Sequence, residues 1–309
     1  MTILAPLLVL LAAVPVRAKG PSPQALSSYS FDPSRPLEAR VETIPPWLLK
    51  LWSDGDKRPD YAPYLPTAAE RKQFEAALDG LPPRMKKVLG ERQIAFYFVK
   101  NLQGNGITDW VLDSSSRTFV YTVLNPAGFG MDVSRLLTER ERSPFRGAAD
   151  VRVEAGADNG ILYTVTHEAA HAFDYVRGLT PYVEPRLPDR RGPGAPKGWD
   201  AWRSYAVARN DDAYPARPNL KFYGFGGGPK LDAAEAPAAC AQWARSPFAS
   251  LYGSRNWADD VAELFVARHF AVDLKLPYIY HCAGTTREPM SDPRVRARAD
   301  RILAPIYGL

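Results

Sequence analysis

The feature that most constrains this chain is the stretch THEAAHAFD at residues 166–174. His167 and His171 are four residues apart, so on an α-helix they lie on one face, one turn apart. Two neutral imidazoles placed in this way can hold one Zn²⁺, and Glu168 beside them can take a proton from water. The stretch therefore predicts a zinc-binding helix that carries a general base. The alternative is a buried helix whose two histidines are only hydrogen-bonded.

The residues around this stretch support a helix. Residues 160–165 run into it without a helix-breaking residue, and Gly178 follows it as expected for a helix C-terminus. At 100° per residue, His167, His171 and Asp174 fall within one narrow arc. We therefore expect Asp174 to lie beside the histidines and to support them.

A catalytic zinc needs a third protein ligand, and residues 256–270 are the best place to look for it. Asn256 is a plausible N-cap for a helix there. On that helix Asp259 falls inside the apolar arc, and a carboxylate that faces a core must be paired or bound to a metal. This predicts Asp259 as the third ligand. Glu263, one turn later, either bonds a ligand histidine or is itself the ligand. The alternative is that Asp259 and Asp260 only place negative charge in the first turn.

Two segments, HEAAHAFDY and YGSRNWADDVAELF, resemble the gluzincin-type zinc endopeptidases related to anthrax lethal factor. That family pairs an HExxH helix with a later helix whose metal-binding Glu follows a Tyr by seven residues, and Tyr252 precedes Asp259 by seven. The resemblance implies His167, His171 and Asp259 as metal ligands, Glu168 as the base and Tyr252 as the stabiliser of the oxyanion. It covers roughly 30 residues directly, and residues 120–309 by the order of elements.

The chain departs from the family in the third ligand. The family uses Glu where this chain has Asp259, whose side chain is one methylene shorter. Glu263 therefore stays open as the third ligand. Tyr223 and His281 are alternative donors to the oxyanion.

The resemblance implies an α+β, zincin-like metallopeptidase fold. In such a fold a small mixed sheet packs on the HExxH helix, and a mainly helical C-terminal lobe follows. Residue patterns predict helices over 67–79 and 133–142 and strands over 94–99 and 117–124. The second strand is a candidate sheet edge along which an extended peptide pairs. A plain core strand is the alternative for it.

The sequence predicts three regions. Residues 1–18 look like a signal peptide, although no Lys or Arg precedes the apolar run, and an uncleaved hydrophobic N-terminus is the alternative. Residues 19–60 are rich in Pro and are expected to form an extended arm. Residues 61–309 are expected to form the zincin-like catalytic domain. Within it, residues 179–238 form a long loop excursion with at most short helices, such as 198–208.

Composition and cysteine usage bound the setting in which the chain works. The net charge of +5 is spread along the sequence without a basic stripe among aromatics, so no nucleic-acid partner is expected. The N-terminal apolar run is too short for stable membrane insertion. Export to the periplasm or outside the cell predicts a disulfide between Cys240 and Cys282, the only two cysteines. A monomer is the default oligomeric state.

These patterns predict a secreted endopeptidase that uses one Zn²⁺ and acts on a polypeptide substrate. Two alternatives stay open. One is an inactive protein that holds zinc for binding alone, and the other is a zinc amidase that acts on a non-protein amide such as a cell-wall crosslink. Glu168 favours an enzyme, because a protein that only holds a metal does not need that base.

Overall fold

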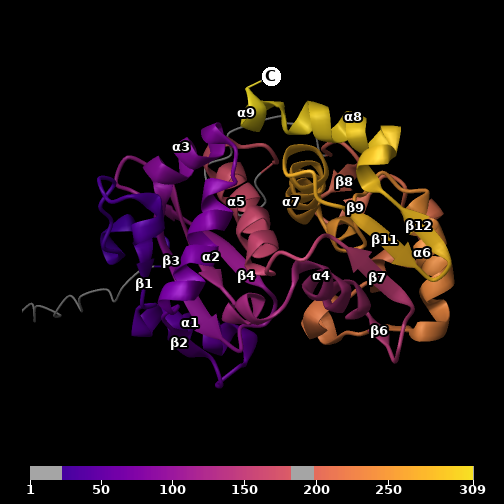
Figure 1. Cartoon of the computed structure of the whole chain (residues 1–309), viewed down its shortest axis with the longest axis horizontal. Helices are drawn as coiled ribbons and strands as arrows, with labels where there is room; N and C mark the ends of the chain where they lie inside the picture. The colour runs from indigo at the N-terminus through magenta and orange to yellow at the C-terminus, as the bar shows by residue number, and fades with distance from the viewer. Residues whose placement is uncertain (1–22, 182–197, 309) are drawn as a thin grey trace, which may run out of the picture.

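The computed structural model describes residues 23–181 and 198–308, which form an α+β arrangement (Figure 1). The described helices are α1 (Pro46–Asp56), α2 (Ala68–Asp79), α3 (Pro83–Arg92), α4 (Val133–Arg142), α5 (Ile161–Arg177), α6 (Ala236–Ala244), α7 (Trp257–Arg268), α8 (Pro293–Ile302) and α9 (Ala304–Tyr307). The described strands are β1 (Val41–Glu42), β2 (Ala62–Tyr64), β3 (Gln93–Lys100), β4 (Gly106–Leu112), β5 (Thr118–Leu124), β6 (Phe145–Arg146), β7 (Val151–Glu154), β8 (Trp202–Ser204), β9 (Val207–Ala208), β10 (Leu231–Asp232), β11 (Ile279–Cys282) and β12 (Thr285–Arg287). The predicted signal peptide, residues 1–18, lies outside the described residues.

A five-stranded mixed sheet forms the N-terminal half. Its order is β1-β3-β5-β4, with β2 paired antiparallel to β3. β1, β3 and β5 run parallel, and β4 runs antiparallel to β5. The prediction that residues 117–124 form a sheet edge is wrong, because β5 lies between β3 and β4. All its side chains are buried, as suits a central strand.

Helices cover both faces of this sheet. α5 packs on β4 and β5, and α2 and α3 pack beside it on the same face. The other face holds a second apolar cluster that includes Leu48 of α1. Within the predicted extended arm, residues 19–60, the stretch 46–56 is not extended, because it forms α1. Pro46 stands at the first helical position, where its fixed φ favours a helix and its missing N–H costs nothing.

Two predicted helices begin where their caps place them. α2 starts after Thr67, which forms a capping box with Glu70. α4 starts after Asp132, whose side chain accepts a hydrogen bond from the Arg135 amide at 2.7 Å. Both helices therefore follow local signals in the sequence.

The C-terminal half is built on α7, which packs against α5 in the middle of the molecule (Figure 1). α8 also packs against α7. The expectation of a mainly helical lobe is wrong in part, because β7, β11 and β12 form an antiparallel sheet there. These strands are only three or four residues long, and β7 is far from β11 in sequence, so local patterns do not reveal their pairing.

Two further expectations concern the long loop excursion and the cysteines. The short helix expected over 198–208 is wrong, because β8 and β9 form a hairpin there. Trp202 anchors that hairpin by donating a 2.8 Å hydrogen bond to Asp260. The predicted disulfide is confirmed, since Cys240 of α6 bonds to Cys282 of β11. Among the described residues, no helix is long and apolar enough to cross a membrane.

Candidate metal centre

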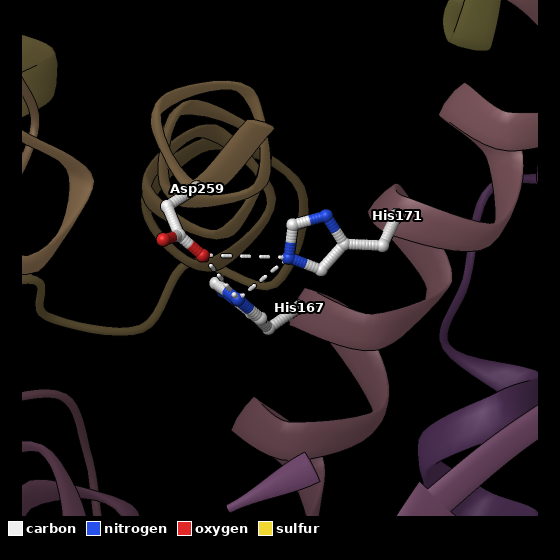
Figure 2. A group of neighbouring side chains, drawn as sticks. All are labelled: His167, His171 and Asp259. Atoms are coloured by element: carbon white, nitrogen blue, oxygen red, sulfur yellow. Dashed lines mark hydrogen bonds and ion pairs between the residues drawn. The ribbon is translucent and has the colours of Figure 1, made fainter. Parts of the chain in front are cut away.

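The two histidines of the motif lie on the face of α5 that meets α7. The helix follows Gly160, where an added Cβ would lie only 2.6 Å from Leu136 Cδ1, so α4 and α5 approach closely at this point. It ends at Gly178, whose left-handed backbone closes the last turn. Figure 2 shows the His167 and His171 rings projecting from α5 toward Asp259 on α7.

Three donor atoms converge between these helices. His167 Nε2 and His171 Nε2 are 3.1 Å apart, and Asp259 Oδ1 lies 3.8 and 3.6 Å from them, respectively (Figure 2). Ligand atoms that surround one Zn²⁺ tetrahedrally at about 2.0–2.2 Å lie about 3.3–3.6 Å from one another. The observed spacing fits a single ion of this size. Two imidazoles and one carboxylate also match the usual donor set of a catalytic zinc.

Local structure leaves one oxygen of Asp259 free to face the histidines. Asn256 caps α7 by accepting hydrogen bonds from the Ala258 and Asp259 amides. Its own amide donates to Asp259 Oδ2 at 2.7 Å, and Arg255 lies 3.4 Å from the same oxygen. Oδ1 is then the oxygen turned toward the two imidazoles.

Glu263, the other candidate ligand, lies behind His167 instead of at the convergence point. Its Oε1 lies 2.9 Å from His167 Nδ1, on the far side of the ring from Asp259. Arg140 donates to both Glu263 oxygens at 2.8 and 2.9 Å, and Tyr163 donates to Oε1 at 2.8 Å. A carboxylate held in this way accepts a hydrogen bond from Nδ1–H. That leaves the Nε2 lone pair of neutral His167 for a metal.

The pKa values of the three groups reflect this pairing. Burial raises the pKa of Glu263, but Arg140 and His167 outweigh this effect and lower the pKa to about 2. Burial likewise opposes the charged form of Asp259, yet Arg255 and the histidines hold its pKa well below the usual range. Burial lowers the pKa of His167, and the nearby carboxylates of Asp259 and Glu263 raise it to about 9. The two acids therefore stay ionised at neutral pH.

Glu168 faces the sheet beside the centre, where β4 holds its carboxylate. Thr108 donates a 2.7 Å hydrogen bond to Glu168 Oε2 and lies 3.1 Å from Thr122 on the neighbouring strand. At Gly106 an added Cβ would lie 2.8 Å from both Cγ and Oε1 of Glu168. Only glycine leaves room for the carboxylate in this position.

A cavity of about 240 Å³ opens at the centre and is lined by His167, Glu168, His171 and Asp259. The predicted oxyanion donor, Tyr252, also lines it, with its ring centroid 5.7 Å from that of His167. Burial raises the pKa of Tyr252, so its hydroxyl stays protonated.

The two alternative oxyanion donors differ in position. Tyr223 lines the same cavity, and its hydroxyl accepts a 2.9 Å hydrogen bond from Asn105. His281 lies on β11 outside the cavity lining and pairs with Glu154 at 3.1 Å. The geometry therefore keeps Tyr223 as an alternative to Tyr252 and removes His281.

Asp174, expected to support the histidines, serves the end of α5. Its two oxygens accept hydrogen bonds from the backbone amide and the hydroxyl of Thr180, at 2.7 and 2.5 Å. Burial raises its pKa, and these hydrogen bonds oppose the rise. In the structure Asp174 therefore stabilises the turn after the helix.

Three residues of the site were missed in the sequence, and one of them left a signal. Arg140 follows Val133, Leu136 and Leu137 at the spacing of a buried helix face, so an arginine there should have indicated a buried ion pair. Gly106 and Thr108 lie about 60 residues before Glu168 in sequence, on a strand that was not predicted. No local pattern connects them to the motif.

Comparisons of the chain with models of known protein families, with curated proteins and with solved structures find no match.

Proposed function

We propose that this protein is a secreted or periplasmic zinc-dependent endopeptidase with a zincin-like fold. One observation carries the proposal: His167, His171 and Asp259 converge at the spacing of a three-ligand zinc centre, with Glu168 at the wall of the same cavity. The disulfide between Cys240 and Cys282 supports an oxidising compartment.

When bound, Zn²⁺ supplies a Lewis acid that polarises the scissile carbonyl and makes water acidic enough to lose a proton near neutral pH. Glu168 takes that proton as general base and later delivers it to the leaving amine. Thr108 and the space left by Gly106 orient the Glu168 carboxylate for both transfers. Tyr252 donates its hydroxyl proton in a hydrogen bond to the developing oxyanion, with Tyr223 as the alternative donor.

The edge strand β4 supplies a surface on which a peptide can lie. Its residues 106–108 line the cavity. At the other end of the strand Leu112 bridges to Ala25, so the N-terminal segment covers that end. We infer that an extended substrate adds to β4 at the cavity end, through backbone hydrogen bonds.

Substitution of the base tests the proposal. Purified protein should bind close to one equivalent of zinc and cleave members of a proteome-derived peptide library. Glu168→Gln should keep the zinc and lower the cleavage rate about 10²–10⁴-fold, because only the general base is lost. His171→Ala should lose the zinc, and Glu139→Gln, at an exposed position on α4, is the matched control.

Three results would argue against this function. If wild-type protein bound no zinc, the proposed metal centre would be wrong. If the Glu168→Gln variant cleaved as fast as wild type, Glu168 would not be the general base and the proposed mechanism would be wrong. Bound zinc without cleavage of any peptide would favour the zinc-holding protein or an amidase with a non-protein substrate.

A further inference from the structure

A second cavity, of about 370 Å³, adjoins the one at the metal centre. Four residues line both of them, so the two spaces meet at these side chains: Tyr205, Phe225, Arg255 and Asn256. The second cavity adds Arg217 and Lys221, and none of its described lining residues is acidic. We call the space lined by these six residues the basic side cavity.

The three cations of the basic side cavity differ in what they already bind. Arg217 is buried, and its donors are already used. It pairs with Asp211 and donates hydrogen bonds to the carbonyls of Ser254 and Ala206 at 2.9 and 2.8 Å. Its role is to hold the walls together. It leaves little capacity for a ligand.

Arg255 and Lys221 retain free hydrogen-bond donors. Within residues 23–181 and 198–308, the Arg255 guanidinium makes one ion pair, at 3.4 Å to Asp259, and lies over the Tyr252 ring, but it donates no hydrogen bond. In the same part of the chain, Lys221 has neither a hydrogen bond nor an ion pair. Asp259 also faces the metal centre, so it only partly compensates Arg255. Two cations with unused donors thus line the same cavity.

Gly228, the last residue of the glycine triplet at 226–228, makes room for Lys221. An added Cβ at Gly228 would lie 2.3 Å from Lys221 Cβ, whereas one at Gly226 would be in ordinary contact with the lysine stem, 3.5 Å from its Cδ. Both Gly226 and Gly227 also have a left-handed backbone. The loop is therefore shaped around the stem of this lysine.

We propose that the basic side cavity binds a carboxylate of the substrate, through Arg255 and Lys221. A guanidinium and an ammonium with free donors, in a partly enclosed space, favour such an anion. The carboxylate belongs either to an Asp or Glu side chain near the scissile bond or to a free C-terminus, since both carry the same group. This inference rests on the proposed peptidase function, because it names the class of peptide that the same site selects.

The test uses binding and cleavage together, so that the two proposals can fail separately. Binding is measured by calorimetry on zinc-loaded Glu168→Gln protein. The ligands are short peptides of one sequence, chosen independently of cleavage and each made with Glu or Gln at a central position, and with a free or an amidated C-terminus. Cleavage of the same peptides by wild-type protein gives kcat/KM. We expect peptides with Glu, or with a free C-terminus, to bind at least tenfold more tightly than their uncharged partners. A tenfold difference in Kd corresponds to about 1.4 kcal/mol of binding free energy.

Variants of Lys221 assign that preference to the cavity. Lys221→Met should remove most of the preference for the charged peptide and leave the affinity for the uncharged one unchanged. Lys221→Arg should restore it. Lys72→Met, at an exposed position on α2, is the control for the change in net charge. Arg255 is unsuitable for this purpose, because it also contacts the ligand Asp259.

The outcomes separate the two claims. Cleavage and binding that do not distinguish charged from uncharged peptides would overturn the carboxylate site and leave the peptidase intact. A charge preference that persists in Lys221→Met would also overturn it. Selective binding without any cleavage by wild-type protein would support the carboxylate site and contradict the peptidase. If neither peptide of a pair bound, the carboxylate site would be overturned as well.

Discussion

Glu168 depends on a glycine that no local pattern connects to it. Gly106 lies on β4, and its missing side chain is the space that the Glu168 carboxylate occupies. Thr108, two residues later on the same face of the strand, fixes one carboxylate oxygen. The orientation of the Glu168 carboxylate, the proposed base, is therefore set by the edge strand as well as by α5, and a small change at residue 106 should affect the proposed catalysis alone.

Gly106→Ala tests this dependence. The new Cβ would lie 2.8 Å from Glu168, so the carboxylate must move. We expect kcat to fall about 10–100-fold, as for other small displacements of a reacting group, with zinc content unchanged. Gly90→Ala on α3 is the control, because a Cβ there meets nothing within 4 Å. Equal kcat values for the two variants would show that the base does not need this space.

His167, a candidate metal ligand, likewise depends on partners outside the motif. His167 Nδ1 faces Glu263, and Glu263 is held by Arg140 from α4. Arg140 and Glu263 are both fully buried. Their bidentate contact joins α4 to α7 directly behind the α5 histidine, so three helices are linked through one ion pair.

Removal of Arg140 should destabilise this arrangement of helices. Arg140→Met leaves the carboxylates of Glu263 and Glu141 buried without their cation. We expect a loss of about 3–5 kcal/mol in the free energy of unfolding, measured by urea denaturation. Arg135→Met, which removes an exposed ion pair on the same helix, should cost less than about 1 kcal/mol. Arg140→Met combined with Glu263→Gln should recover part of the loss, and a double variant less stable than Arg140→Met would contradict the pairing.

Helix periodicity is the reason why the candidate metal ligands could be predicted before the sheet. The place of His167, His171 and Asp259 on their helices follows from spacing, and both helices have a recognisable boundary, at Gly178 and at Asn256. Periodicity also reduced the choice of third ligand to two acids. It could not decide between them, because that depends on how α5 and α7 face each other.

The parts that escaped prediction depend on pairings across long sequence distances. β4 begins Gly-Ile-Thr-Asp, which lacks a clear alternation, and it becomes a strand because β5 is beside it. β7 and β11 are four residues each and pair across more than 120 positions. The pairing that makes β4 an edge strand and the second sheet of the molecule therefore appear only once the chain is folded.

The C-terminal part of the molecule is tied together by a buried arginine and its acid. Arg287 of β12 donates to the carbonyls of Trp243, Ser246 and Phe248. It also donates a 2.7 Å hydrogen bond to Asp292, which caps α8. The hydrogen bonds and ion pair of Arg287 thus connect α6, the loop after it, β12 and α8.

Asp292 should make the stability of the whole chain depend on acid pH. Burial raises its pKa, but hydrogen bonds from Arg294 and Arg287 outweigh this effect and hold the pKa well below the usual range. A depressed pKa contributes stability that is present above the unfolded-state value, about 3.9, and is lost as the pH falls below it. Asp292→Asn keeps a capping oxygen but loses the charge, so we expect it to unfold about 1–2 kcal/mol more easily at pH 7.

The difference between wild type and Asp292→Asn should shrink as the pH falls from about 4 toward 2, because Asp292 gains a proton in the unfolded wild-type chain while the folded protein still holds it ionised. Urea denaturation at a series of pH values measures it directly, and subtraction removes the contribution of the other acids that both proteins share. Asp54→Asn, at an exposed position on α1, should change the free energy of unfolding at pH 7 by less than about 0.5 kcal/mol. A difference for Asp292→Asn that stays constant down to pH 2 would mean that its charge does not stabilise the contact with Arg287.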